Sequence, residues 1–197
     1  MKRNLLNSLF IIALLAIGLG ACNTKKEEAP KEPKVLTVYY SLWGNTTLLA
    51  NMIHNTVGGD IFLIETATPY PTDNAHAAAQ KQIDEGVLPE LKGKVEDLAS
   101  YDIIFIGTPN WFGSTSLPVK AFLKENDLTG KTVIPFATFG GSVDNALAGI
   151  VEACPNSTVL EGFSVSGDDA KNPEKNVEAQ VKTWIETLYL TLKNNVQ

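Results

Sequence analysis

A neutral, hydroxyl-rich turn precedes the first helical pattern of the folded region, in the stretch YYSLWGNTTLLA at residues 39–50. Ser41, Thr46 and Thr47 supply hydroxyl groups there. Gly44 lets the backbone approach a ligand closely. The free N–H groups and the dipole of a helix N-terminus favour anions. We therefore expect an anion site in this turn, although the same residues would also suit an ordinary capped turn.

The expected anion is a single phosphate held without positive side chains. A nucleoside triphosphate site of the GxxxxGK[ST] type needs a lysine at the phosphates. No lysine occurs between Val35 and Gln80. The GxGxxG pattern of dinucleotide-binding turns is absent from the sequence as well. The sequence therefore favours a phosphate monoester bound by neutral donors.

Two later segments, TPNWFGSTS and TFGGS, place aromatic rings beside glycines. An aromatic ring can flank a flat ligand, and a neighbouring glycine lets the main chain reach the rim of that ligand. Trp111 is the strongest stacking candidate, with Phe112 or Phe139 as a second wall. Backbone amides near Gly113 and Gly140 could bind heteroatoms of the ligand. The alternative is that Trp111 and Phe112 only cover the edge of a sheet.

Strand-like and helix-like segments alternate along the chain, which predicts an α/β fold of three layers. Five short runs rich in β-branched and aromatic residues are expected to be parallel strands: Val35 to Tyr40, Ile61 to Glu65, Ile103 to Gly107, Thr132 to Ala137 and Thr158 to Phe163. The hydroxyl-rich turn and the two aromatic segments each follow one of these strands. In an open parallel sheet, ligands bind at the carboxyl ends of the strands. The three segments are therefore expected to meet at one edge.

Apolar residues at helical spacing fill the segments between the strands and cover both faces of the sheet. Helices are expected around residues 48–57, 75–85, 119–123, 143–151 and 177–192. Gly58-Gly59 should end the first helix, and Asn172-Pro173 should open the last one. His76 could lean over the ligand edge from the start of its helix, although a surface histidine is the more ordinary interpretation.

The start of the chain has the features of a secretory signal. Lys2 and Arg3 precede an apolar run, and small residues lead to Cys22. The ending LGAC resembles the lipobox of bacterial lipoproteins, which implies cleavage before Cys22 and lipidation of its sulfur. A transmembrane helix is the alternative, but the apolar run is shorter than the roughly 20 residues that span a bilayer. We expect residues 1–21 to be a signal peptide.

Residues 22–34 are rich in charge and proline, which predicts a disordered, lipidated tether. Residues 35–197 then have the length of one domain. Without residues 1–21 the chain has 14 basic and 22 acidic residues, a formal net charge of −8. This charge argues against nucleic acid as a partner. Cys154 would be the only thiol left, so we expect no disulfide and no metal site. Asn23 mildly favours the outer membrane, if the cell has two.

Three motifs in order resemble those of the flavodoxin-like family. They are YYS with GNT at residues 39–46, PNWFG at 109–113 and PFAT with GGS at 135–142. The resemblance covers Val35 to about Phe163. It implies a five-stranded parallel sheet in the order 2-1-3-4-5, helices on both faces and bound flavin mononucleotide (FMN). Trp43 departs from the pattern, because many relatives have a threonine there.

The resemblance carries the cofactor-binding role to three groups of residues. The residues expected to bind the phosphate are Ser41, Trp43, Gly44, Asn45, Thr46 and Thr47. The residues expected to line one side of the flavin ring are Pro109, Asn110, Trp111, Phe112 and Gly113. Those expected to line the other side are Thr138, Phe139, Gly140, Gly141 and Ser142. No residue is predicted to be catalytic by itself.

The expected function is that of an FMN-binding, lipid-anchored protein outside the cytoplasm. It would transfer electrons or reduce a small acceptor such as a quinone, with a redox protein or that acceptor as its partner. The alternative is a flavodoxin-shaped binding module without turnover.

Overall fold

The computed structural model describes residues 32–71 and 73–194. Its centre is a seven-stranded sheet with the path β2-β1-β3-β5-β6. The path strands are β1 (Val35–Tyr39), β2 (Asp60–Leu63), β3 (Ile103–Trp111), β5 (Thr132–Phe139) and β6 (Thr158–Val159), and every neighbouring pair is parallel. β7 (Phe163–Ser166) also pairs with β5 in parallel, whereas β4 (Ser114–Thr115) is antiparallel to β3. The predicted parallel α/β fold is confirmed.

The fifth expected strand, Thr158 to Phe163, is divided into β6 and β7, so β5 has two strand partners where the predicted order 2-1-3-4-5 had one. Val133 of β5 pairs with Val159, and Phe136 pairs with Phe163. Between these two pairs the partner has one residue more than β5, as in a β-bulge. Ile134 and Pro135 of β5 lie opposite this bulge, and Pro135 has no N–H to donate. A Cβ on Gly162 would lie 2.7 Å from the Pro135 carbonyl oxygen, so a glycine fits this close approach.

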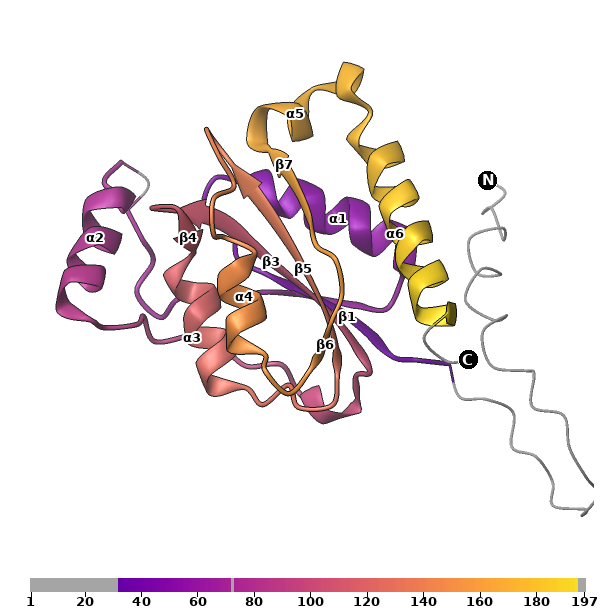
Figure 1. Cartoon of the computed structure of the whole chain (residues 1–197). Helices are drawn as coiled ribbons and strands as arrows, with labels where there is room; N and C mark the ends of the chain where they lie inside the picture. Colours follow the sequence, from indigo (N-terminus) through magenta and orange to yellow (C-terminus); the bar gives the residue numbers. More distant parts are fainter. Residues whose placement is uncertain (1–31, 72, 195–197) are drawn as a thin grey trace, which may run out of the picture.

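Two pairs of helices cover the two faces of the sheet (Figure 1). α1 (Asn45–Val57) and α6 (Val177–Asn194) lie on one face, and α3 (Leu117–Glu125) and α4 (Ala148–Ala153) on the other. α2 (Ala75–Glu85) extends from one end of the molecule, and the short α5 (Gly167–Lys171) follows β7. The short 3-10 helices η2 (Leu98–Ser100) and η3 (Pro173–Lys175) precede β3 and α6.

Each face of the sheet has its own hydrophobic core. Ile104 and Ile106 of β3 pack with Phe122 of α3 on one face. Phe105 of the same strand faces the other side, where Ile53 of α1 packs. Successive side chains of a strand point to opposite faces, so a strand covered on both faces is apolar without interruption. This explains the run IIFIG in the centre of the sheet.

Two predicted helix boundaries are wrong. The helix expected at residues 143–151 begins only at Ala148, because Asp144 has a left-handed φ of 41° and Asn145 donates its N–H to the Gly113 carbonyl oxygen. Asn172-Pro173 opens η3 rather than the last helix. Asn176, with φ 46°, separates η3 from α6. α1 and α2 lie where the sequence predicted them.

Most of the predicted tether and all of the predicted signal peptide lie outside the described residues. Lys34, at the end of the predicted tether, is fixed to the domain: its N–H donates to Asp102 Oδ2 at 2.8 Å, and its carbonyl oxygen accepts from Asp102 N–H at 2.9 Å. Within the described ranges, the helices are too short or too polar to cross a bilayer.

Candidate functional site

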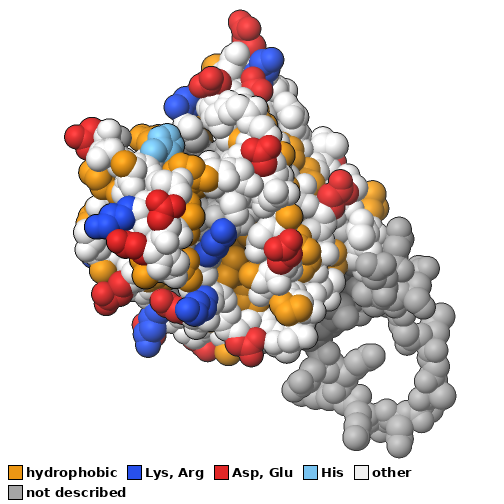
Figure 2. Space-filling view, turned by 60° about the vertical axis from the view of Figure 1, so that its left-hand side comes forward, with side chains coloured by type: hydrophobic (Ala, Val, Ile, Leu, Met, Phe, Trp, Pro, Cys, Tyr) orange, Lys and Arg blue, Asp and Glu red, His pale blue; other side chains and the backbone are white. Residues whose placement is uncertain are grey.

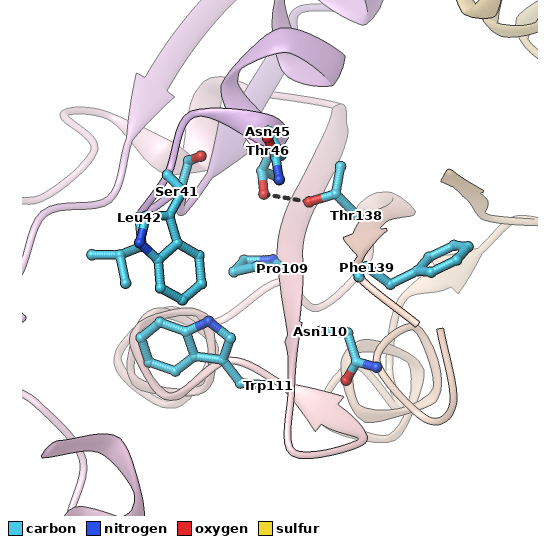
Figure 3. A pocket seen from close by; sticks show the side chains of 11 residues that line it. Ser41, Leu42, Asn45, Thr46, Pro109, Asn110, Trp111, Thr138 and Phe139 are labelled. Carbon is cyan, nitrogen blue, oxygen red and sulfur yellow. Dashed lines mark hydrogen bonds between the residues drawn. The ribbon is translucent and has the colours of Figure 1, made fainter. Parts of the chain in front are cut away.

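A pocket of about 120 Å³ lies at the carboxyl ends of β1, β3 and β5 (Figure 3). Its lining is Ser41, Leu42, Trp43, Asn45, Thr46, Pro109, Asn110, Trp111, Thr138, Phe139 and Gly140. All three predicted segments contribute to it. Only Leu42 was not named from the sequence. Of the remaining predicted residues, Gly44, Thr47, Phe112, Gly113, Gly141 and Ser142 do not line it.

The turn after β1 presents backbone N–H groups to this pocket. Gly44, with a left-handed φ of 85°, is the N-cap residue of α1 and has no side chain that could cap the helix. The first turn of α1 contains no acidic residue. Ser41 Oγ accepts from Thr47 N–H at 3.3 Å, which directs this hydroxyl to the helix start. The turn therefore offers the neutral donors that an anion needs.

A buried hydroxyl pair joins the turn to β5. Thr46 Oγ1 and Thr138 Oγ1 lie 2.8 Å apart, and both side chains are buried (Figure 3). Asn45 packs against the start of α5, where a Cβ on Gly167 would lie 2.2 Å from Asn45 Nδ2. The turn is thus held by β5 on one side and by α5 on another.

The sequence predicted that this strand ends at Gly107, but β3 continues into the site. Pro109, Asn110 and Trp111 are strand residues, and Pro109 pairs with Thr138 of β5. Phe112 and Gly113 form a two-residue turn, with φ 53° and 72°, that leads into β4. Left-handed values at both positions are typical of the tight hairpin turns that follow strand twist.

A polar network ties this hairpin to the segment after β5. Asn110 Nδ2 donates to the Ser142 carbonyl oxygen and, at 3.2 Å, to Asp144 Oδ2. Ser142 Oγ donates to Asp144 Oδ1. The Gly113 carbonyl oxygen accepts from Asn145 N–H at 3.1 Å. These bonds fix the distance between the two sides of the pocket that the sequence assigned to the flavin ring.

Trp111 is held in a buried cluster of three rings. Its side chain is 4% exposed, and its ring centroid lies 5.5 Å from that of Tyr40 and 4.9 Å from that of Tyr70, with both pairs edge to face. Tyr70 Oη donates to Gln82 Oε1 on α2. Burial raises the pKa of Tyr70 to about 12, and burial together with Tyr70 raises that of Tyr40 further. Both phenols therefore stay neutral at physiological pH.

The other aromatic residues of the site are more open. Phe112 is 49% exposed and Trp43 is 48% exposed. Phe139 is half-buried, and its ring points away from Trp111 (Figure 3). Gly140 and Gly141 are exposed, and a Cβ on either would meet nothing within 4 Å. The segment after β5 therefore has free space beside its backbone.

Unpartnered polar atoms concentrate at the pocket. Among the described residues, five buried side-chain N or O atoms have no hydrogen-bond partner, and three of them belong to pocket residues: Asn45 Oδ1, Asn110 Oδ1 and Trp111 Nε1. Such atoms are rare in folded proteins and call for a ligand or solvent partner. Asn45 and Asn110 can accept from a ribityl hydroxyl or a ring N–H, and Trp111 can donate to a ring carbonyl. The donor set thus fits a phosphorylated flavin.

Sequence reasoning missed the supporting residues of this site. Tyr40 and Tyr70 enclose Trp111, and Asp144 accepts from Asn110. Tyr40 stands in the motif that opens the site, so its identity was visible although its role was not. Tyr70 and Asp144 reach the site only through long-range packing, for which a local pattern gives no signal.

The flavodoxin family model matches residues 34–188, most of the chain. A solved protein from Bacteroides uniformis described as a flavoprotein is 31% identical, with a TM-score of 0.66 over 79% of this chain and 99% of that one. A flavoprotein from Lactobacillus acidophilus, solved in complex with FMN, is 23% identical, with a TM-score of 0.59 over 67% of this chain and 93% of that one.

Curated relatives match a shorter part. An NAD(P)H dehydrogenase (quinone) from Afipia carboxidovorans is 34% identical over 95 residues, which are 47% of this chain and 46% of that protein. The chain spans about half the length of the curated relatives it matches.

The chain belongs to the flavodoxin family. This membership and the neutral donors of the pocket together support FMN as the cofactor.

Proposed function

We propose that this protein is a lipid-anchored FMN flavoprotein that transfers electrons or reduces a small acceptor such as a quinone. The observation that carries the proposal is the pocket itself: a neutral helix start lies at the cavity, and three of its lining residues each have a buried polar atom without a hydrogen-bond partner. Without lysine or arginine in its lining, this pocket suits a monophosphate.

The residues have separate tasks in holding FMN. Ser41 and the backbone N–H groups from Gly44 to Thr46 would bind the phosphate. Pro109 to Gly113 would hold one side of the flavin ring and Thr138 to Ser142 the other. FMN, when bound, supplies the electron-transfer chemistry. The chain orients it, and the buried Tyr40–Tyr70–Trp111 cluster keeps water from that wall.

The reduction of a quinone-like acceptor is supported by the relative named NAD(P)H dehydrogenase (quinone). That likeness covers about half of each chain. A redox protein is the second partner class that we propose, because an electron carrier of this family needs one.

A direct test is the visible absorption spectrum of the purified full chain, with and without added FMN. We expect a yellow protein, or a colourless one that binds FMN in a one-to-one ratio. A protein that binds no flavin would contradict the proposal and favour a binding module without turnover. If FMN binds, reduction of ferricyanide by the prereduced protein tests electron transfer separately.

The location is also a proposal. Cleavage before Cys22 and acylation of its sulfur would anchor the protein outside the cytoplasm, with the outer membrane mildly favoured by Asn23. Multiple acyl chains give stable anchoring, whereas a single chain is marginal.

A further inference from the structure

Three aromatic side chains from separate segments meet beside the pocket: Trp43 after β1, His76 at the start of α2, and Phe112 at the tip of the β3–β4 hairpin. We call them the aromatic rim. The centroid of the His76 ring lies 5.5 Å from that of Trp43 and 5.8 Å from that of Phe112. We propose that the aromatic rim binds a flat aromatic acceptor of the quinone class next to the FMN site. This inference rests on the proposed function.

The rim keeps its ring surfaces open. The planes of Trp43 and His76 meet at 59° and those of His76 and Phe112 at 76°, so neither pair is stacked face to face. Trp43 and Phe112 are each about half exposed, at 48% and 49%. In Figure 2, where the α2 side comes forward, histidine surface lies directly beside hydrophobic surface. Clustered exposed apolar surface marks interaction sites.

The backbone of Phe112 has a conformation that is unfavourable for phenylalanine. Its φ of 53° lies in the left-handed region, where bulky residues are rare and asparagine or glycine is favoured in such turns. The hairpin imposes this conformation, because Trp111 pairs with Ser114 and the Gly113 carbonyl oxygen is bonded to Asn145. Strained residues that the surroundings hold in place concentrate at ligand sites.

The chemistry of the rim selects the class of ligand. Trp43 and Phe112 offer faces for stacking on a flat ring, and the exposed imidazole of His76 offers an N–H for a carbonyl oxygen. Trp43 also lines the FMN pocket, so a ligand on the rim adjoins the cofactor. A neutral aromatic ring with carbonyl groups meets all of these conditions.

The test is equilibrium dialysis of the FMN-loaded full chain against anthraquinone-2-sulfonate, a soluble and flat quinone, with cyclohexanesulfonate as the non-aromatic control. We expect anthraquinone-2-sulfonate to bind and cyclohexanesulfonate not to bind. His76→Ala should weaken anthraquinone binding about 3- to 10-fold, the scale of one aromatic contact. Lys81→Ala, an exposed change on the same helix, should leave it unchanged.

Two further variants separate the contributions of His76. His76→Phe keeps a ring without an N–H, and His76→Asn keeps an N–H without the ring. Weaker binding in His76→Phe, with part of it restored in His76→Asn, supports the hydrogen bond to the carbonyl. Full affinity in His76→Phe would overturn that hydrogen bond and leave only stacking.

Failure of this inference is distinguishable from failure of the proposed function. FMN affinity and ferricyanide reduction should be the same in His76→Ala and in the unchanged chain. If the protein binds FMN and reduces ferricyanide but His76→Ala binds anthraquinone-2-sulfonate with full affinity, the rim is not the acceptor site. If anthraquinone-2-sulfonate binds only the FMN-free protein, the rim is part of the flavin site, and the inference is overturned.

Discussion

At the scale of single residues, the site combines side chains that are fixed with others that are open. Trp111 was predicted from the sequence to stack on the flavin, and the structure places it in the pocket lining with its ring enclosed by Tyr40 and Tyr70. Its side chain therefore has a packing role in addition to the predicted binding role. The two roles make different predictions.

Trp111→Ala should lower the free energy of unfolding by about 3–5 kcal/mol, because it removes a large buried side chain and leaves a cavity. Urea unfolding followed by circular dichroism measures this loss. The stacking role adds a loss of FMN affinity of roughly 1–3 kcal/mol. Trp111→Phe is the control, since it keeps a ring between the tyrosines. A Trp111→Ala protein of unchanged stability would contradict the buried packing, and an unchanged FMN dissociation constant would remove Trp111 from the flavin site.

Thr138→Val keeps the shape of the side chain but removes one member of the buried hydroxyl pair. Thr46 Oγ1 would then lose its partner at 2.8 Å. A buried polar group without a partner costs about 1–3 kcal/mol, so we expect lower stability and weaker FMN binding, because Thr46 lies in the phosphate turn. Fluorescence titration with FMN measures the second effect. Thr129→Val is a matched control on an exposed turn, and equal FMN affinity in all three proteins would show that the pair does not position the turn.

At the scale of elements, the sequence predicted the parts that depend on local pattern. β1, β3 and β5 contain apolar runs, and α1 has an amphipathic sequence that ends at Gly58. Local sequence was therefore enough to predict which of these segments are strands and which is a helix. The division of the fifth strand occurs where its pairing with the neighbouring β5 is interrupted, opposite Ile134 and Pro135. The late start of α4 depends on the bond from Asn145 to Gly113. Such contacts join residues far apart in the chain, which periodicity does not record.

A tyrosine–aspartate hydrogen bond connects two elements at the amino edge of the sheet and is expected to be sensitive to alkaline pH. Tyr101, before β3, donates its hydroxyl to Asp60 Oδ2 of β2 at 2.7 Å. This hydrogen bond, with burial and the negative charge of Asp60, raises the pKa of Tyr101 to about 12. The folded pKa is above the unfolded value of about 10. The stabilisation is therefore complete below pH 10 and is lost as the pH rises through 12.

Tyr101→Phe should lower the free energy of unfolding by about 1 kcal/mol at pH 8, the net contribution of one hydrogen bond. The difference between this variant and the unchanged chain should shrink as the pH rises from 10 towards 12. Urea unfolding at pH 8, 10 and 11 measures it. A difference that stays constant over this range would show that the Tyr101 hydroxyl does not titrate with the raised pKa.

At the scale of the whole molecule, Lys34, the last residue of the predicted tether, and the site lie at opposite edges of the sheet. Lys34 is fixed at the amino edge by its hydrogen bonds to Asp102, whereas the pocket lies at the carboxyl ends of β1, β3 and β5. The anchor that we propose at Cys22 would therefore pull on the edge remote from the pocket. Attachment and cofactor binding should then be separable functions.

Cys22→Ser removes the sulfur that the lipid would modify and tests this separation. We expect the unchanged chain in the membrane fraction, extracted by detergent but not by high salt, because an acidic protein gains little from electrostatic attraction to anionic lipids. The variant should lose this membrane retention while it binds FMN with the same dissociation constant. Immunoblots of cell fractions and FMN titration provide the two measurements. Membrane retention of the variant that resists salt would exclude the lipid on Cys22 as the anchor, and a changed FMN affinity would show that the two edges of the sheet are coupled.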